Sequence, residues 1–394
     1  MNVDQLKFNQ AIKGFQENFP LKPTDLFIAP GRVEIVGNHT DHQHGQTLSM
    51  TIDRYIYAAV SKNDDFKVVS YNRGYPVAID IDLNDLSVKE SEYSSSVGLI
   101  RGVFAYFHQH GYRIGGFNCF SISTILRGMG LSSSAAFEVL VAKIINHYYN
   151  DNQISDLEIA KASQFAEQVY FHKPCGLLDQ MTISYGGVVL SDFNQLSPVQ
   201  AHLDKMDNDL HFYVINTGKS HAKLTPHYAQ ITEDLRRVSA VFGQKLLIDV
   251  DYKQFKHQYE MLKHQLGERA LKRAVHIFEE NIRVEKAWDS LNKGQIEAFI
   301  TQIRASGLSS RNYLQNLTYH GDKDRSLITA YDKLYKKTPF GVRVNGGGFA
   351  GTLIVMTNHH EDEAVISKIL NNPKMKILPV KIAKYKSGHV SALD

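Results

Sequence analysis

The sequence predicts a fold of two α+β domains that meet near residue 200. The chain has 394 residues, and a chain of this length usually divides into two domains. Segments with strand and helix patterns follow one another without the regular alternation that a doubly wound sheet requires. The pattern also becomes polar and irregular over residues 196–208. We therefore expect one domain over residues 1–200 and a second over residues 201–394.

The first domain is expected to begin with a helix followed by strands. Apolar residues recur at helical spacing over residues 1–24 and predict an amphipathic helix, which two prolines end. Apolar residues alternate over residues 26–36, which is typical of a strand. Residues 55–61 and 66–71 also have strand character, and the turn residues between them predict that they form a hairpin.

A strand, a loop and a helix are expected next in the first domain. Residues 115–125 have strand character, residues 128–136 are rich in Gly and Ser, and apolar residues then recur at helical spacing over residues 137–148. Residues 158–170 predict another helix. Asp179 is expected in the turn between that helix and the next strand.

The second domain is expected to contain both a sheet and a long helical region. Residues 211–216 predict a strand, and residues 226–306 contain few helix breakers and predict helices. Residues 341–357 predict a strand interrupted by glycines. The glycines of residues 346–351 have the spacing of a dinucleotide fingerprint, but a strand-like run follows them where that fold needs a helix. We therefore expect a tight turn that lets a neighbouring loop or a ligand come close.

Composition excludes several classes of protein. The chain has 44 Lys and Arg against 41 Asp and Glu, so no basic excess indicates a nucleic-acid surface. It has no signal-peptide pattern and no apolar run of about 18 residues, which argues against a membrane partner. Cys119 and Cys175 do not form a CxxC pair, so neither a disulfide scaffold nor a cysteine zinc site is indicated. A cytoplasmic protein with a small ligand is expected.

Residues 128–136, GMGLSSSAA, have the features of an anion-binding loop. Glycines let the backbone approach a phosphate, and the first free N–H groups of the following helix point at it. The alternative is a serine-rich helix cap without a ligand. The small pair Ala135 and Ala136 favours the phosphate site, because a tight loop beside a closely packed helix suits a buried polyphosphate.

A polar cluster follows the first strand. His39, Asp41, His42 and His44 could bind a metal, since imidazole and carboxylate groups are common ligands. The same donors and acceptors also suit a polyhydroxylated substrate, for which Asp41 would be the natural acceptor.

Arg32, Asp179 and Glu167 are further candidates for a role in catalysis. Arg32 follows a turn that could fix its guanidinium beside a reacting hydroxyl, although it could also be a surface residue. Asp179 has apolar neighbours and needs a partner, and a carboxylate beside an arginine can orient a hydroxyl or take its proton. Glu167 is either a metal ligand or a solvated helix residue.

Four segments, in this order and with these gaps, resemble the GHMP small-molecule kinases and, among them, the galactokinases. They are APGRVEIVGNHTDHQ (29–43), GMGLSSSAA (128–136), CGLLDQM (175–181) and VNGGGFAG (344–351), and residues 273–299 and 306–316 also resemble the second half of these enzymes. The resemblance implies an N-terminal domain like domain 2 of ribosomal protein S5, a ferredoxin-like C-terminal domain and an active site between them. It also implies ATP and Mg²⁺.

The resemblance implies a role for each candidate residue. Asp179 and Arg32 would be catalytic, and Ser134 and Glu167 would hold Mg²⁺. The residues expected to contact ATP are Gly128, Gly130, Leu131, Ser132, Ser133, Ser134 and Ala135. Those expected to contact the sugar are Asn38, His39, Asp41, Gly176 and Tyr228.

The implied reaction transfers the γ-phosphoryl group of ATP to the anomeric hydroxyl of galactose. Asp179 with Arg32 would orient or deprotonate that hydroxyl. The expected partner is thus a small sugar, with no nucleic acid or membrane, and the expected state is a monomer or a weak homo-oligomer.

One departure from the family pattern concerns the substrate. The family usually has G-E-H-x-D-Y, but here Asn38 replaces the glutamate that accepts a hydrogen bond from the C6 hydroxyl of the sugar. A neutral acceptor binds a hydroxyl more weakly, and it no longer repels a C6 carboxylate. Galacturonokinases also lack this glutamate and carry Asp-His-Gln, as residues 41–43 do here, so galacturonate or another hexose derivative is the first alternative substrate.

A second alternative is a regulator that binds galactose and ATP without catalysis. Regulators of this kind have a shortened phosphate loop, whereas residues 132–136 are complete here and Arg32 and Asp179 are both present. The sequence therefore favours the enzyme.

Overall fold

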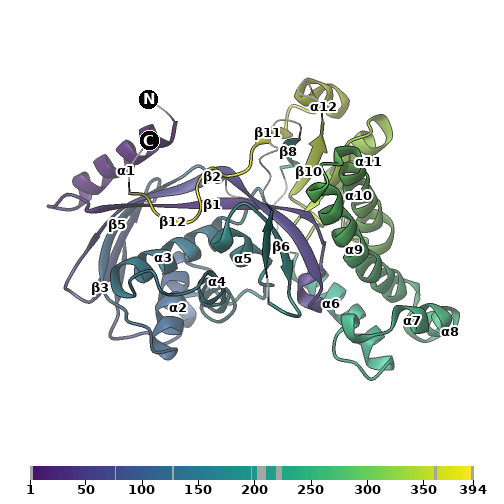
Figure 1. The fold of residues 1–394 in the computed structure, drawn as a ribbon, viewed down its shortest axis with the longest axis horizontal. Coiled ribbons are helices and arrows are strands. Elements are labelled where there is room, and N and C mark those ends of the chain that lie inside the picture. The colour runs from purple at the N-terminus through teal and green to yellow at the C-terminus, as the bar shows by residue number, and fades with distance from the viewer. Residues whose placement is uncertain are drawn as a thin grey trace.

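The computed structural model describes residues 3–75, 77–126, 128–196, 198–201, 210–218, 224–358 and 362–391. Two β-sheets lie side by side along the long axis of the molecule, with helices packed against each (Figure 1). This is the α+β class that the sequence predicts. Within the described residues, the helices are too short or too polar to span a lipid bilayer.

The first sheet is built mainly from the first half of the chain. Its strand order is β12-β1-β2-β5-β3-β4, with β6 also paired to β2 and β7 paired to β6. The strands are β1 (Asp25–Val36), β2 (Gln46–Lys62), β3 (Lys67–Asn72), β4 (Ile79–Asp82), β5 (Phe117–Ser123), β6 (Val188–Asp192), β7 (Val199–Ala201) and β12 (Gly388–His389).

The predicted hairpin of residues 55–61 and 66–71 is wrong, because β5 lies between β2 and β3. β5 pairs antiparallel with β2 and parallel with β3. The start of β5 fits there because Gly116 has no side chain, and a Cβ atom at this position would lie 2.1 Å from Asn63 Oδ1. The backbone N–H of Asn63 donates to Gly116 O at 3.1 Å, so the turn after β2 binds β5 instead of closing a hairpin.

Helices cover both faces of the first sheet (Figure 1). On one face lies α1 (Val3–Asn18), whose Phe15 packs with Ala59 and Ile122. The helices on the other face bury part of the largest hydrophobic cluster among the described residues, and this cluster continues into the second half of the chain at Val214, Phe299 and Ile354. These helices are α2 (Ser96–Gln109), α3 (Ser133–Tyr149), α4 (Asp156–Phe165) and α5 (Leu178–Tyr185).

The helix predicted over residues 158–170 is present in this layer, whereas the predicted placement of Asp179 needs correction. The helix predicted over residues 158–170 changes after α4 into a π-helical turn, Ala166–Tyr170, a conformation often found at functional sites. Asp179 lies in the first turn of α5, so its placement in a turn between a helix and a strand was wrong. Leu178 and Met181 bury one side of this short helix, and a carboxylate in a first turn is stabilised by the helix dipole.

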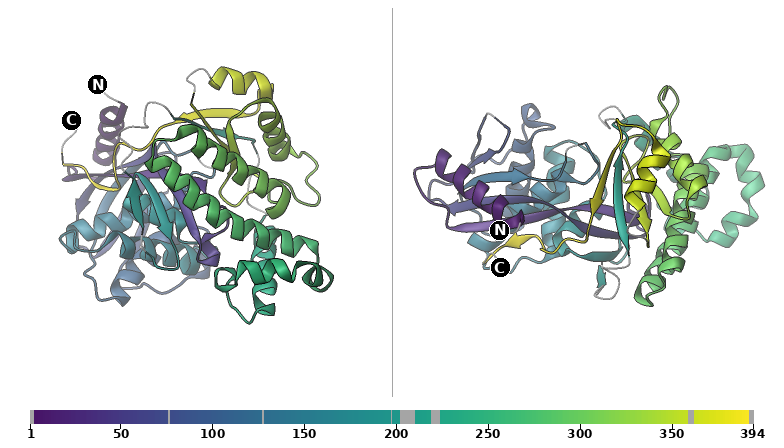
Figure 2. Two further views of the ribbon diagram at one scale, coloured as in Figure 1. Left: turned by 45° about the vertical axis from the view of Figure 1, so that its right-hand side comes forward. Right: turned by 90° about the horizontal axis from the view of Figure 1, so that it is seen from above.

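The second sheet is antiparallel, with strand order β11-β8-β10-β9. Its strands are β8 (His211–Asn216), β9 (Gly341–Asn345), β10 (Thr352–Thr357) and β11 (Lys376–Val380). Helix α10 packs on β9 and α9 packs on α10, as the left view of Figure 2 shows. The helices are α6 (Thr225–Val241), α7 (Tyr252–His257), α8 (Tyr259–Leu266), α9 (Glu268–Asn292), α10 (Ile296–Ser309), α11 (Ser326–Lys337) and α12 (Asp362–Leu370).

The C-terminal segment returns to the first sheet after β11. Ile382 forms a bridge with Ile52, and β12 then pairs antiparallel with β1. Figures 1 and 2 show this yellow segment beside the N-terminal strands. The range 201–394 predicted for the second domain therefore includes residues that belong to the first sheet.

Candidate active site

Residues 128–132, which we call the β5–α3 loop, lead directly into helix α3. Gly128 and Gly130 have φ angles of 72° and 63°, a region that glycine adopts without strain. Ser132 stands at the N-cap position with φ of 57°, but its side chain makes no capping hydrogen bond. The alternative of a serine cap on this helix is therefore wrong at Ser132. The first N–H groups of α3 donate no hydrogen bond to the Ser132 side chain, as an anion-binding helix start requires.

The β5–α3 loop is held by residues of both sheets. Arg32 Nη1 donates to Gly130 O at 2.7 Å, and Asn345 Nδ2 donates to the same oxygen at 2.9 Å. Thr352 Oγ1 donates to Met129 O at 3.0 Å. Because β1 and the β9–β10 hairpin both fix these carbonyl groups, the loop conformation depends on the packing of the two sheets.

Arg32 and Asp179 form an ion pair beside this loop. Arg32 Nε and Nη2 lie 2.7 Å and 2.5 Å from Asp179 Oδ1, and Ser132 Oγ donates to Asp179 Oδ2. Arg32 is only 5 % exposed, so the alternative of a surface arginine is wrong. Burial raises the pKa of the Asp179 carboxyl, but the Arg32 charge and the hydrogen bond from Ser132 lower it by more, and the pKa lies below its usual value.

Glu167 faces Ser134 across the start of α3. Ser134 Oγ donates to Glu167 Oε1 at 3.0 Å, Lys173 Nζ lies 2.6 Å from the same oxygen, and Gln180 Nε2 donates to Oε2 at 2.7 Å. Glu167 is 1 % exposed, so the alternative of a solvated helix residue is wrong.

The oxygen donors at this position fit Mg²⁺, which prefers hydroxyl, carboxylate and water ligands. A further buried carboxyl, Glu138, lies on α3 one turn after Ser134, and its Oε1 atom has no hydrogen-bond partner among the described residues. Burial and the nearby charge of Glu167 raise the pKa of Glu138 well above its usual value. Sequence reasoning missed Glu138, Lys173 and Gln180, since no local pattern shows that they converge on Glu167.

Three further residues of the predicted ATP site lie in the β5–α3 loop or at the start of α3. Leu131 and Ala135 have buried side chains, so only their backbone can face a ligand, and Ser133 is the first residue of α3.

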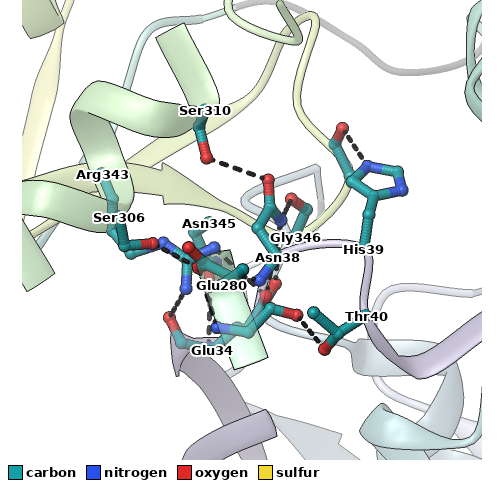
Figure 3. Close-up of polar contacts among 12 residues, drawn as sticks. Glu34, Asn38, His39, Thr40, Glu280, Ser306, Ser310, Arg343, Asn345 and Gly346 are labelled. Atoms are coloured by element: carbon teal, nitrogen blue, oxygen red, sulfur yellow. Dashed lines mark hydrogen bonds and ion pairs between the residues drawn. The ribbon is translucent and has the colours of Figure 1, made fainter. Parts of the chain in front are cut away.

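Residues 37–45, which we call the β1–β2 loop, are fixed by a carboxylate of the second domain. Glu280 on α9 accepts hydrogen bonds from the backbone N–H groups of Gly37 and Asn38 at 3.1 Å and 3.2 Å (Figure 3). Its other oxygen pairs with Arg283 at 2.7 Å. Burial raises the pKa of Glu280, but Arg283 and the other charges around it lower the pKa to about 2, so the group is ionised at neutral pH.

The Asn38 side chain uses its hydrogen-bonding groups within the protein. Its Nδ2 atom donates to Gly346 O at 2.8 Å, and its Oδ1 atom accepts from Ser310 at 3.4 Å (Figure 3). The same Oδ1 atom also accepts from Asn316 at 2.8 Å. Glu34 lies 3.4 Å from the same Nδ2 and is paired with the buried Arg343 at 3.1 Å. A sugar hydroxyl would have to replace one of these contacts to reach Asn38.

The turn of residues 346–351 receives side chains from neighbouring segments, which confirms the predicted close approach. His39 Nε2 lies 2.9 Å from Gly347 O, and Tyr228 donates to Gly348 O at 3.0 Å. A Cβ atom at Gly348 would lie 2.3 Å from Asn316 O, so a side chain would prevent this packing.

The cluster of His39, Asp41, His42 and His44 does not have the geometry of a metal site. His39 Nδ1 lies 3.0 Å from His42 Nε2, which is a hydrogen-bond distance. Among the residues that the structure describes, three possible metal-ligand atoms lie within 4.8 Å of one another only in the group of Asp25, His147 and His389, which is outside this cluster. Burial lowers the pKa of both His39 and His42 to about 4, so the two rings are neutral at pH 7.

Gly176 lies against Asp41, and this contact gives a testable prediction. A Cβ atom at position 176 would lie 1.7 Å from Asp41 Oδ2. The Gly176→Ala variant is therefore expected to displace the Asp41 carboxylate and to raise KM for the predicted sugar substrate, with KM for the predicted ATP substrate nearly unchanged. Steady-state kinetics with each substrate varied measures this. An unchanged sugar KM would show that Asp41 does not contact the sugar.

Comparison with known proteins places the chain in a family. A family model described as the galactokinase galactose-binding signature matches residues 13–62, and the model of the GHMP kinase N-terminal domain matches residues 98–187. The galactokinase of Thermotoga petrophila is 30% identical over 332 residues, which cover 84% of this chain and 88% of that protein. The galactokinase of Clostridium tetani is 28% identical over 98% of this chain and 95% of its own length.

Solved structures show the same fold. The crystal structure of Lactococcus lactis galactokinase complexed with galactose matches with a TM-score of 0.83 and 23% identity, over 98% of this chain and 99% of that chain. Methanococcus jannaschii mevalonate kinase matches with a TM-score of 0.63 and 16% identity, over 91% of this chain and 98% of that chain. With sequence, fold and the placement of the motifs in agreement, the chain belongs to the galactokinase family of the GHMP kinases.

Proposed function

We propose that this protein transfers the γ-phosphoryl group of ATP to the anomeric hydroxyl of galactose. The observation that carries the proposal is the Arg32–Asp179 pair, which contacts Gly130 and Ser132 of the β5–α3 loop and whose two charges also act on the Asp41 carboxyl. The loop that would bind the phosphates and the cluster that would bind the hydroxyl are thus both linked to one carboxylate, an arrangement that suits phosphoryl transfer to an alcohol.

The residues around this pair have distinct proposed roles. The backbone of the β5–α3 loop and the start of α3 would hold the triphosphate, with contributions from Gly128, Gly130 and Ser132. Ser134 and Glu167 would hold Mg²⁺, which neutralises charge on the phosphates when bound. Lys173 Nζ pairs with Glu167 Oε1, so this lysine would have to move away or share that oxygen with the bound Mg²⁺.

The sugar would lie near Asp41, His39 and Gly176, against the turn that Tyr228 also contacts. Both ring nitrogens of His39 have partners, His42 and Gly347 O, so a sugar hydroxyl would have to replace one of these contacts, whereas the Asp41 carboxylate can accept a hydrogen bond from a hydroxyl. Asn38 would shape this pocket chiefly through its contacts with Gly346 and Asn316.

The lowered pKa of Asp179 indicates how it would act on the anomeric hydroxyl. A carboxylate whose pKa is lowered is a weak base, so Asp179 would chiefly orient the anomeric hydroxyl and take its proton late in the transfer. Arg32 holds that charge in place and would face the transferred phosphoryl group.

The Arg32→Gln variant tests this electrostatic coupling through its pH profile. Without the guanidinium, burial raises the pKa of Asp179, so the ionised form is lost at a higher pH than in the wild-type protein. We expect the acidic limb of kcat/KM to move to a higher pH than in the wild-type protein. The Arg32→Lys variant keeps the charge and should keep the limb near its original position, and an unmoved limb in Arg32→Gln would contradict the coupling.

We further propose a cytoplasmic monomer or weak homo-oligomer that acts on a free sugar and has no nucleic-acid or membrane partner. The balanced charge and the absence of a long apolar segment among the described residues support this proposal.

The test of the proposed function is ADP release from purified protein with Mg²⁺ and ATP, measured separately with galactose, galacturonate, N-acetylgalactosamine, glucose and mevalonate. Galactose is expected to give the highest kcat/KM. A higher value with galacturonate would make Asn38 a specificity residue and change the substrate. Binding of galactose and ATP without turnover of any sugar would support the regulator instead.

A further inference from the structure

A group of two histidines and one aspartate lies where the C-terminal segment crosses β1, and none of the proposed catalytic residues belongs to it. His389 Nε2 lies 3.1 Å from Asp25 Oδ1, and His147 Nε2 lies 3.8 Å from the same oxygen. One ligand atom from each of the three residues lies within 4.8 Å of the other two. The three side chains are 21 %, 25 % and 27 % exposed for Asp25, His147 and His389, so solvent reaches the group.

Rigid elements hold the two histidines in place. His389 is in β12 and pairs with Phe27 of β1, and Val390 N donates to Leu26 O at 2.8 Å. His147 is in the last turn of α3. The two imidazole rings stack with centroids 4.4 Å apart, and Phe27 packs edge-on against both at 5.4 Å and 5.5 Å.

Neighbouring groups also orient Asp25. Thr24 and Tyr148 donate hydrogen bonds to Asp25 Oδ2 at 2.6 Å and 2.8 Å, which leaves Oδ1 facing the histidines. The side-chain amide of Asn152 lies 3.3 Å from His147 Nδ1. The atom that faces the ring is Nδ2, which donates to Nδ1, so metal binding at Nε2 requires the amide to turn its oxygen toward the ring and Nδ1 to carry the proton. Such outer contacts are typical of carboxylate and imidazole groups that bind metals.

We propose that Asp25, His147 and His389 bind a divalent transition-metal ion of the Zn²⁺ type. In a tetrahedral site with bonds of about 2.0–2.2 Å, the ligand atoms are about 3.3–3.6 Å apart. The two distances to Asp25 Oδ1, 3.1 Å and 3.8 Å, lie on either side of this value. Because the two rings are stacked at an interplanar angle of 11°, the exposed His389 ring must rotate out of the stack to bring both Nε2 lone pairs onto one ion, and water completes the coordination.

The donor set separates this site from the position that Ser134 and Glu167 would offer to Mg²⁺. Two imidazoles and one carboxylate suit Zn²⁺, Co²⁺ or Ni²⁺, whereas Mg²⁺ prefers oxygen ligands alone. A bound ion would connect β12 to β1 and α3, and would thus hold the C-terminal segment on the first sheet.

The test uses the full chain without a histidine tag, treated with chelator and kept in excess Mg²⁺ at about pH 7.5. Isothermal titration calorimetry with Zn²⁺ is expected to show one strong site, and Co²⁺ should give a visible absorption spectrum. His389→Gln and Asp25→Asn should each weaken Zn²⁺ binding at least tenfold. Tyr148→Phe, which removes the hydrogen bond to Asp25 and the contact of the same hydroxyl with Thr24 Oγ1, should weaken Zn²⁺ binding about tenfold or more.

The matched control is His108→Gln, which changes an exposed histidine outside the group and should leave Zn²⁺ binding unchanged. Amide hydrogen exchange over residues 385–391 is expected to slow when Zn²⁺ is bound to the wild-type protein and to stay unchanged in His389→Gln. The proposal fails if the wild-type protein has no Zn²⁺ site under these conditions. It also fails if His389→Gln and His108→Gln bind Zn²⁺ equally well.

Discussion

The Asp179→Asn variant is expected to phosphorylate galactose about 10³-fold more slowly than the wild-type protein. Asparagine has nearly the same shape as aspartate, but it has no charge for Arg32 and cannot accept the hydroxyl proton. KM for ATP should change little, because Asp179 contacts the β5–α3 loop only through Ser132. Steady-state kinetics with galactose and ATP measures both effects.

The Asp179→Asn result needs a control for stability, because the substitution leaves Arg32 buried without its ion pair. Asp53→Asn removes the ion pair with Arg54 in the middle of β2 and serves as the matched control. It should keep wild-type kcat. If folded Asp179→Asn retained more than a tenth of wild-type kcat, Asp179 would have no catalytic role.

The Glu280→Ala variant is expected to have a free energy of unfolding about 3–5 kcal/mol lower than the wild-type protein. The substitution removes the acceptor for the N–H groups of Gly37 and Asn38 and leaves Arg283 without its buried partner. Urea denaturation measures the loss. The sugar KM should also rise, since the β1–β2 loop carries His39 and Asp41.

The pH dependence of stability checks the ionisation of Glu280. The folded-state pKa of about 2 is below the unfolded value near 4.5, so this contribution is present above pH 4.5 and is lost as the pH falls toward 2. Glu280→Gln should therefore lose less stability than the wild-type protein over that range. Glu285→Gln, at an exposed position of the same helix, should change the free energy of unfolding by less than about 0.5 kcal/mol. If Glu280→Gln and Glu285→Gln lost the same free energy of unfolding between pH 4.5 and pH 2, Glu280 would not fix the β1–β2 loop.

The sequence was most informative where a site is built from contiguous residues. The glycines and serines of residues 128–136 specify a loop that enters a helix, because their backbone preferences are local. The glycine turn at residues 346–351 was interpreted correctly for the same reason. The need of Asp179 for a cationic partner also followed from its apolar neighbours, and Arg32 supplies that partner.

Contacts between distant segments could not be predicted from the same patterns. Glu280 binds the N–H of Gly37 across 243 residues, and Arg343 binds Glu34 across 309 residues. No periodicity encodes such pairs, because the packing of the two sheets creates them. The hairpin error has the same origin, since β5 enters between β2 and β3 from a later part of the chain.

The most direct test of the account is to identify the product by phosphorus NMR after incubation with galactose, ATP and Mg²⁺. We expect one new sugar phosphate, equal in amount to the ADP formed, whose phosphorus couples to the anomeric proton of galactose. Phosphate on another hydroxyl, or consumption of ATP without any sugar phosphate, would contradict the assignment of this protein as a galactose 1-kinase.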